Sequence, residues 1–253
     1  MPQVQVNGAD IYYEEAGTGT PLLLLHGLLE TGRSQAHLMQ ILARQYRVIT
    51  PDLRGYGRSE PGPRTFPPDV YERDTTDMAA LLDHLGIAQA VVMGVADGAE
   101  IALLLAIRRP ALVRAVVAVS VTGALHPSLL DVLPTLDTWD TPPAPDDTSP
   151  RAEAIREYGL DGARAIWRGW AGAVRDRIAA GGNISMAEAG RISCPVLIIN
   201  GADDTLNTPA MSHALAQAIP TAELHLVADV DQQIYNKRRQ WLADFVLTWL
   251  AAH

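Results

Sequence analysis

The chain has little of the chemistry that several classes of protein require. Its single cysteine, Cys194, excludes an intrachain disulfide. Only one of its 20 basic residues is a lysine and its formal net charge is -9, so nucleic acid is not an expected partner. The sequence has no His, Cys, Asp and Glu cluster with metal-ligand spacing and no glycine-rich dinucleotide turn. We therefore expect no metal and no cofactor.

Long hydrophobic runs are missing as well. The N-terminus has no basic region followed by an apolar stretch, and no apolar run reaches the roughly 20 residues that cross a bilayer. Secretion, membrane insertion and a membrane partner are thus not expected. Cys194 precedes the apolar run 196–199, which predicts a buried thiol and a soluble, cytoplasmic protein.

What the sequence does contain is an alternation of buried elements. With 253 residues, 48% of them hydrophobic, the chain can build one large domain that carries an insertion. Apolar runs alternate with amphipathic segments of helix length, which predicts a parallel sheet with strands buried on both faces. A hairpin is expected around Asn7-Gly8. The expected strands are 22–25, 48–49, 90–93, 113–119, 196–199 and 224–227, and the expected helices are 35–44, 71–85, 98–108, 209–218 and 236–251.

One long region breaks this alternation. Residues 137–149 concentrate Pro, Asp and Thr, and helical patterns resume at 151–158 and 162–178. We interpret the region as a helical insertion that covers the core. The expected division is a core of residues 1–121 and 192–253 and a helical lid of residues 122–191.

The stretch 91–100 has the pattern of a sharp turn between a strand and a helix. Gly94 and Gly98 stand two positions either side of Ala96 and supply the small residues that such a crowded, strained turn requires. A turn of this kind holds a nucleophile, usually a serine, at the tip of a strand. Here Ala96 occupies that position, so the geometry is kept and the hydroxyl is missing.

Four motifs follow one another along the chain: Leu25-His26-Gly27-Leu28, the segment 52–59 (Asp-Leu-Arg-Gly-Tyr-Gly-Arg-Ser), the turn around Ala96, and Gly201-Ala202-Asp203-Asp204. With them the chain resembles the α/β-hydrolase superfamily over essentially its whole length. The resemblance implies a mostly parallel eight-stranded sheet with flanking helices and a helical lid. It also implies that the backbone N–H groups of Leu28 and Asp97 donate to an oxyanion.

The chain departs from this family at two positions. The family acid corresponds to Asp204, whose usual role is to orient a histidine. Counting back from the final helix puts Gln232 where that histidine should be, and a shift of one residue would put Asp231 there. Ala96 and Gln232 are therefore interpreted as degenerate triad positions. The absence of both the serine and the histidine is better explained by natural divergence than by a single engineered substitution.

Other side chains are candidates for contact with a substrate. Trp139, Trp167 and Trp170 fall in the predicted lid, where they either line a pocket or pack the lid onto the sheet. Of these we assign Trp167 and Trp170 to substrate binding. We also assign two histidines to substrate binding: His26 in the His-Gly turn and His126 at the entrance of the lid. A surface or packing role is the alternative for His126.

An aspartate follows the apex of the turn. Dehalogenases and epoxide hydrolases of this fold use an aspartate nucleophile, but they carry it at the apex, which here is Ala96. We therefore expect the Asp97 side chain to point away from the substrate, so that this residue offers chiefly its N–H.

The remaining chemistry favours a reaction with a low barrier. Binding and the oxyanion donors alone leave on the order of 10³ to 10⁴ of rate acceleration, which is too little for useful ester or amide hydrolysis. Two backbone donors would suffice to stabilise an enolate-like anion formed next to a carbonyl. The base would be Asp204, Asp161 or a carboxylate of the substrate. In having lost its hydrolytic residues the chain is similar to the divergent α/β-hydrolase that epimerises an aspartyl centre in bottromycin-type peptide pathways.

The sequence therefore predicts a non-hydrolytic enzyme of bacterial specialised metabolism that acts on a small metabolite or modified peptide. The expected reaction is epimerisation or isomerisation, or else cyclisation or decarboxylation. Two alternatives stay open. One is a non-catalytic protein that binds the metabolite or peptide in the old cavity. The other is a serine hydrolase inactivated at Ala96.

Overall fold

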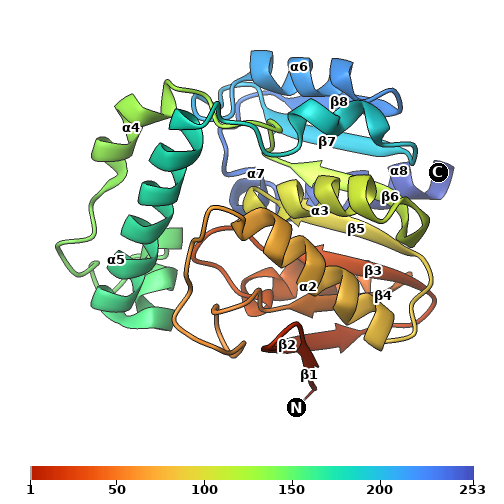
Figure 1. Cartoon of the computed structure of the whole chain (residues 1–253), viewed down its shortest axis with the longest axis horizontal. Helices are drawn as coiled ribbons and strands as arrows, with labels where there is room; N and C mark the ends of the chain where they lie inside the picture. The colour runs from red at the N-terminus through yellow and green to blue at the C-terminus, as the bar shows by residue number, and fades with distance from the viewer. Residues whose placement is uncertain (1) are drawn as a thin grey trace.

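The computed structural model describes residues 2–253 and is built on an eight-stranded sheet (Figure 1). The strands are β1 (Gln3–Val6), β2 (Ala9–Ala16), β3 (Thr20–Leu25), β4 (Tyr46–Pro51), β5 (Ala90–Val95), β6 (Val113–Val119), β7 (Val196–Gly201) and β8 (Ala222–Val227). Their order in the sheet is β1-β2-β4-β3-β5-β6-β7-β8. The pairs β1–β2 and β2–β4 are antiparallel, and the rest are parallel, so the predicted fold class is confirmed.

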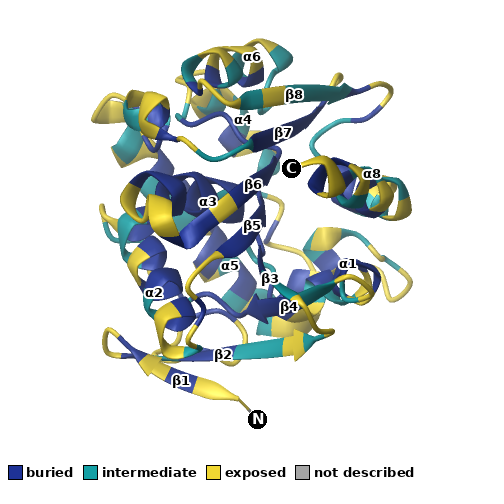
Figure 2. Cartoon of the chain, turned by 90° about the vertical axis from the view of Figure 1, so that its right-hand side faces the viewer, coloured by how far each residue is buried: buried dark blue, intermediate teal, exposed yellow. Residues whose placement is uncertain are grey.

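Helices cover both faces of this sheet (Figure 2). They are α1 (Ala36–Leu42), α2 (Val70–His84), α3 (Asp97–Arg108), α4 (Leu129–Leu136), α5 (Pro150–Ala179), α6 (Pro209–Ala218), α7 (Ile234–Lys237) and α8 (Arg239–Ala252), with 3-10 turns at Gly32–Gln35, Pro110–Leu112 and Met186–Arg191. One hydrophobic cluster lies between the sheet and α2, α3 and α6, and a second lies between the sheet and α1 and α8. The central strands are apolar throughout because both of their faces are covered.

The predicted strands and helices are present, but three predictions about burial or continuity are wrong. β8 is an edge strand whose residues are mostly half-buried, so the prediction that it is buried on both faces is wrong. The expected helix 236–251 is divided into α7 and α8, because Arg238 leaves the helical region at φ -135 and ψ 33. Cys194 is half-buried rather than buried, and its burial raises the pKa of the thiol to about 11.

The insertion between β6 and β7 stands beside the sheet (Figure 1). Its long helix α5 is interrupted at Gly159, where φ 71 and ψ 164 are non-helical, and this explains the two separate helical patterns in the sequence. The insertion has its own small hydrophobic cluster, which includes Leu133, Trp139 and Trp167. Its last residues behave differently, because Ile184 joins the main core instead.

The turn between β5 and α3 is as tight as the sequence predicts. Ala96 has φ 50 and ψ -118, a conformation that side chains disfavour. A Cβ built on Gly94 would lie 2.2 Å from the carbonyl oxygen of Gly98, and one on Gly98 would lie 2.5 Å from that of Leu25. Only glycine therefore lets β5 and α3 approach this closely.

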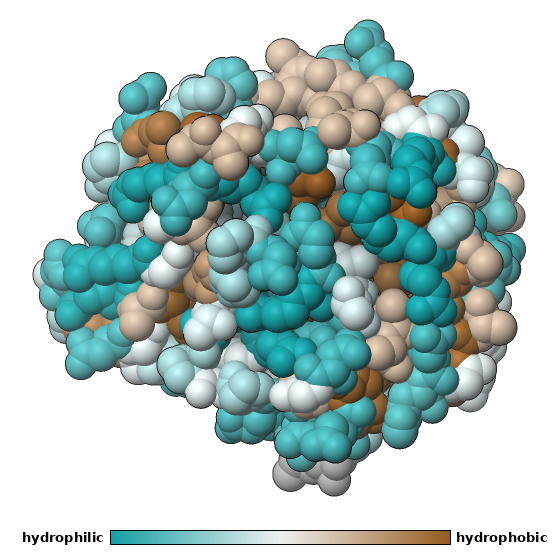
Figure 3. All heavy atoms as spheres, in the orientation of Figure 1, coloured by the Kyte–Doolittle hydropathy of each residue, from teal (hydrophilic) through white to brown (hydrophobic). Residues whose placement is uncertain are grey.

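The outer surface offers little apolar area. Figure 3 shows apolar residues scattered among hydrophilic ones on the visible face. Among residues 2–253, Leu130 is the only large hydrophobic residue classed as exposed. Over the same residues no helix combines the length and apolarity that crossing a bilayer needs. Internal cavities are therefore the candidates for a ligand site.

The glycine packing of the turn is testable by mutation. We expect Gly94→Ala to lower the free energy of unfolding by roughly 3 kcal/mol, since its Cβ would overlap backbone atoms that cannot move independently. Gly172→Ala is the matched control, because Gly172 is helical with no heavy atom within 4 Å of its Cβ position. That variant should gain up to about 1 kcal/mol. Equal urea midpoints for the two variants would contradict this account of the turn.

Candidate functional site

A cavity of about 460 Å³ lies between the carboxyl ends of β5 and β6 and the insertion. It brings together predicted residues from distant parts of the chain. Its lining includes Leu28, Ala96, Asp97, Gln232, Trp167 and Trp170. Ligand sites in open parallel sheets form at this edge, so the cavity is the natural candidate site.

The backbone amides of Leu28 and Asp97 are free to serve a ligand. Within residues 2–253 neither N–H donates a hydrogen bond. A Cβ built on Gly27 would lie 3.4 Å from the Cβ of Ala96, so the His-Gly turn lies directly against the apex of the other turn. The arrangement can supply two N–H donors beside one point, which is the requirement for stabilising an anion.

Glu30 holds the His-Gly turn in place through hydrogen bonds. Its Oε2 accepts a hydrogen bond from the N–H of Gly27 at 3.0 Å, while its carbonyl oxygen accepts one from the hydroxyl of Tyr158 at 3.1 Å. Tyr158 belongs to α5, so the same residue ties the turn to the insertion. Burial raises the pKa of the Glu30 carboxyl.

Gln232, which is predicted from the sequence to stand where the family has its histidine, lines the cavity together with Ala96. The hydroxyl of Ser120 donates to the carbonyl oxygen of Gln232 at 3.3 Å and so positions its backbone. The alternative register is not supported by the geometry. Asp231 lies outside the cavity lining and forms an ion pair with Lys237 at 2.8 Å, which lowers the pKa of its carboxyl.

Asp204 is buried but does not line the cavity, which corrects its prediction as the base. Its Oδ1 accepts hydrogen bonds from the N–H groups of Leu206 and Asn207, at 2.8 and 2.9 Å. Its Oδ2 is buried and has no partner within residues 2–253. Burial raises the pKa of this carboxyl. The other acid considered as a base, Asp161, has a side chain that is 94% exposed and is paired with Arg164.

Neither predicted histidine contacts the cavity. His26 is fully buried, with Nδ1 2.8 Å from the carbonyl oxygen of Gly27 and Nε2 accepting from the N–H of Leu53 at 3.0 Å. Burial lowers the pKa of its ring to about 4, so the ring is a neutral structural brace. His126 is exposed and bonded to Ser128. Both are therefore removed from the set of predicted ligand contacts.

The Asp97 side chain does not point away from the cavity, contrary to the sequence prediction. Its Oδ1 accepts a hydrogen bond from the hydroxyl of Tyr71 at 2.9 Å, and both residues line the cavity. Tyr71 is the second residue of α2 and approaches the start of α3 because α2 and α3 pack together. The carboxyl is partly accessible yet enclosed enough that burial raises its pKa.

Glu100 is a cavity residue that the sequence interpretation missed. It is 5% exposed, and its two oxygens accept from the N–H of Gly123 and the hydroxyl of Ser185, each at 2.7 Å. Burial raises the pKa of its carboxyl to about 7. A single acid inside the apolar helix 98–108 is the signal that could have identified it.

The tryptophans of the insertion line the cavity and pack within the insertion itself, whereas the alternative drawn from the sequence is packing of the lid onto the sheet. Ring centroids are 5.8 Å apart for Trp139 and Trp167 and 5.2 Å apart for Trp167 and Trp170. The row contributes to the cluster of the insertion, and all three residues line the cavity. Their role in binding substrate stays a prediction.

These features can now be compared with known proteins. A family model described as the alpha/beta hydrolase fold matches residues 20–162, which is more than half of the chain. The chain belongs to the α/β-hydrolase family. The matched segment contains the His-Gly turn and the turn at Ala96, so it covers both halves of the possible anion site.

Two of the relatives that the chain matches are named as hydrolases. The chain is 28% identical over 241 residues to the serine hydrolase BPHL of Homo sapiens, covering 90% of this chain and 78% of that protein. It is 37% identical over 102 residues to the soluble epoxide hydrolase of Corynebacterium sp. (strain C12), covering 40% of this chain and 34% of that protein. The second match is thus confined to a minor part of each chain.

Solved structures match over nearly the whole length. A serine hydrolase from Cycloclasticus zankles superimposes with a TM-score of 0.82 at 20% identity, covering 99% of this chain and 97% of that one. The enol-lactonase from Burkholderia xenovorans LB400 gives 0.75 at 22% identity, covering 99% and 100%. At these identities the likeness establishes the fold alone.

Glu100 should leave a signature in the pH dependence of stability. Its pKa is raised in the folded state, so this residue favours folding below the unfolded value of 4.5 and costs stability as pH rises toward about 7. As the pH rises from 5 to 8, the unfolding free energy of Glu100→Gln minus that of wild type should increase by roughly 3 kcal/mol. Urea unfolding across this range measures the difference. A constant difference between the two proteins would show that Glu100 is ionised in the folded state.

Proposed function

We propose that this protein is a non-hydrolytic enzyme, an epimerase or isomerase, that stabilises an enolate-like anion of a small metabolite or modified peptide. One observation carries the proposal. The N–H groups of Leu28 and Asp97 have no partner within residues 2–253, and both residues line, together with Ala96, a cavity whose described lining includes no imidazole. Such donors stabilise developing negative charge without a nucleophile.

The cavity also suggests the base. Asp97 is an acid that lines the cavity next to its own backbone N–H, and Tyr71 keeps its carboxyl oriented. A raised pKa makes this carboxylate a better proton acceptor than an ordinary aspartate. It would take the proton from the carbon next to the substrate carbonyl while the two N–H groups hold the carbonyl oxygen. Water then donates a proton to the opposite face of the planar anion and Asp97 releases its proton to solvent, which gives the epimer.

Hydrolysis is the activity of the relatives, and the site lacks its usual nucleophile and base. Ala96 carries no hydroxyl, and Gln232 has no basic nitrogen that could accept a proton at neutral pH. A pure binding role is the remaining alternative. It predicts tight binding without any exchange of carbon-bound hydrogen.

Hydrogen exchange tests the proposed chemistry directly. The protein is incubated in deuterium oxide with small ketones, esters and aspartyl peptides that bind it, and exchange at the acidic C–H is followed by NMR. We expect exchange above background, reduced about 100-fold or more by Asp97→Asn, which removes the base and keeps the backbone N–H. Asp161→Asn, on the exposed surface, is the matched control and should exchange normally. Bound substrates that never exchange would reject the enzyme and favour the binding protein.

Rebuilding the hydrolase tests the interpretation of Ala96 and Gln232. Ala96→Ser alone should hydrolyse p-nitrophenyl acetate no faster than wild type, because no base activates the hydroxyl. Ala96→Ser with Gln232→His should be about 100-fold faster or more, since the free Oδ2 of Asp204 can accept the imidazole N–H. Ordinary esterase rates for the single variant would instead identify an inactivated hydrolase.

A further inference from the structure

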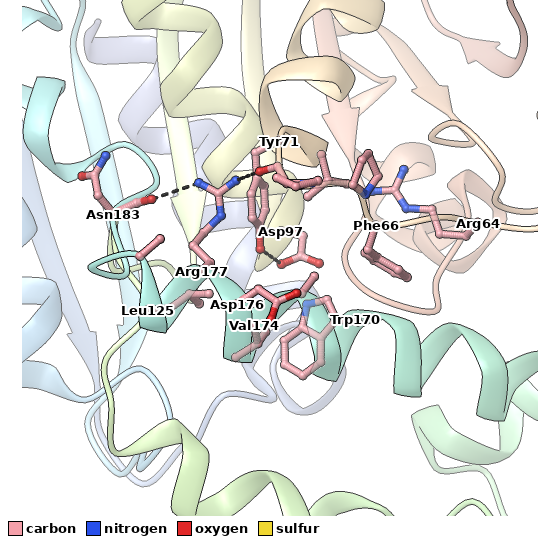
Figure 4. A pocket seen from close by; sticks show the side chains of 15 residues that line it. Arg64, Phe66, Tyr71, Asp97, Leu125, Trp170, Val174, Asp176, Arg177 and Asn183 are labelled. Carbon is pink, nitrogen blue, oxygen red and sulfur yellow. Dashed lines mark hydrogen bonds between the residues drawn. The ribbon is translucent and has the colours of Figure 1, made fainter.

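A second cavity, of about 370 Å³, lies on the far side of the Asp97 side chain (Figure 4). The two cavities share four lining residues, which come from α2, α3, the segment after β6, and α5: Tyr71, Asp97, Leu125 and Trp170. They are thus neighbouring chambers divided by a shared wall.

Part of the lining of the second chamber is apolar. Phe66, Pro67, Pro68, Val70 and Val174 contribute apolar surface. These groups form a setting that suits an aromatic ring or a branched apolar group.

Arginines brace this chamber without being free to bind an anion. Arg64 is buried and paired with Asp74. Arg177 donates to the carbonyl oxygens of Pro68 and Asn183, and its guanidinium lies 5.2 Å from the ring centroid of Tyr71 (Figure 4). The chamber therefore offers apolar surface and no free cation, and the exposed carboxylate of Asp176 at its lining has no ion pair within residues 2–253.

The wall between the chambers is polar, in contrast to the second chamber. The Tyr71 hydroxyl is bonded to Asp97. The indole nitrogen of Trp170 is buried and has no acceptor at hydrogen-bond geometry within residues 2–253. It lies close enough to Asp97 to lower the pKa of that carboxyl, against the larger effect of burial, so the N–H is only poorly satisfied. An unpaired buried donor is costly and rare, and a ligand carbonyl at the wall would satisfy it.

We propose that the second chamber is a subsite for an aromatic or branched apolar arm of the ligand whose reacting centre lies at Ala96. The arm reaches the chamber past Trp170 and Tyr71 through a linkage that carries a carbonyl group, such as an amide. This inference rests on the proposed function, and it narrows the substrate to an extended, amide-linked molecule with a group on each side of the wall.

A pair of probes tests the subsite by affinity alone. N-acetyl-phenylalanine methylamide carries one apolar arm, and N-(3-phenylpropanoyl)-phenylalanine methylamide carries two. Isothermal titration calorimetry should give the two-armed probe an affinity about 10-fold higher or more, from burial of the second ring. Equal affinities, including no detectable binding of either probe, would overturn the subsite.

A bulky side chain in the second chamber tests whether the higher affinity of the two-armed probe comes from that chamber. Ala173→Phe, on the α5 lining, should reduce the affinity of the two-armed probe to that of the one-armed probe and leave the latter unchanged. Ala179→Phe, exposed on the same helix and outside the lining, should change neither affinity. Unchanged one-armed binding shows that the filled variant is folded. An unaltered difference between the probes in Ala173→Phe would overturn the proposal. These measurements report affinity and not turnover. Failure of the subsite can therefore be told apart from failure of the proposed reaction, which the hydrogen-exchange experiment tests.

Discussion

The close contact between β5 and α3 at the turn of Ala96 is the constraint on which the site depends. No Cβ fits at Gly94 or Gly98, so the helix begins immediately after the strand, and its first residue, Asp97, lines the cavity with an N–H that no helical carbonyl can accept. Ala96 keeps a positive φ of 50 although it has no reacting group to present. Such strain costs on the order of 1–3 kcal/mol and persists only where the surroundings enforce it. Here the enforcement is the packing itself, together with the bond from the Ala96 N–H to Val119.

Two of the residues that line the cavity beside this turn are acids with no ion pair within residues 2–253. Asp97 and Glu100 both line it, and for both the largest influence on the pKa is burial, which raises it. Their hydrogen bonds come from a phenol, a hydroxyl and a backbone amide. A raised pKa favours proton transfer by a carboxyl group more than a lowered one does. Asp231 is the contrast, since Lys237 keeps it ionised at the surface.

The sheet and most helices could be predicted from the sequence because apolar runs and turn glycines report directly on burial and backbone geometry. The helix α4 escaped prediction, as its short, leucine-rich segment contains Pro134 and belongs to the irregular insertion. In the site, backbone donors were predictable from their motifs, whereas side-chain directions were not. The orientation of Asp97 depends on Tyr71, 26 positions away, and the role of Glu100 depends on Gly123 and Ser185, so both require the tertiary contacts.

Asp204 shows how a residue can keep its place while its surroundings change. In its family the acid orients a histidine, and here one buried oxygen has no partner, a condition that costs about 1–3 kcal/mol when water cannot reach the group. The other oxygen caps the turn at Leu206 and Asn207. Asn207 in turn donates to the carbonyl oxygen of Ser120, whose hydroxyl holds the backbone of Gln232. The carboxylate is therefore an anchor for the cavity wall, and this structural task accounts for its retention without an imidazole beside it.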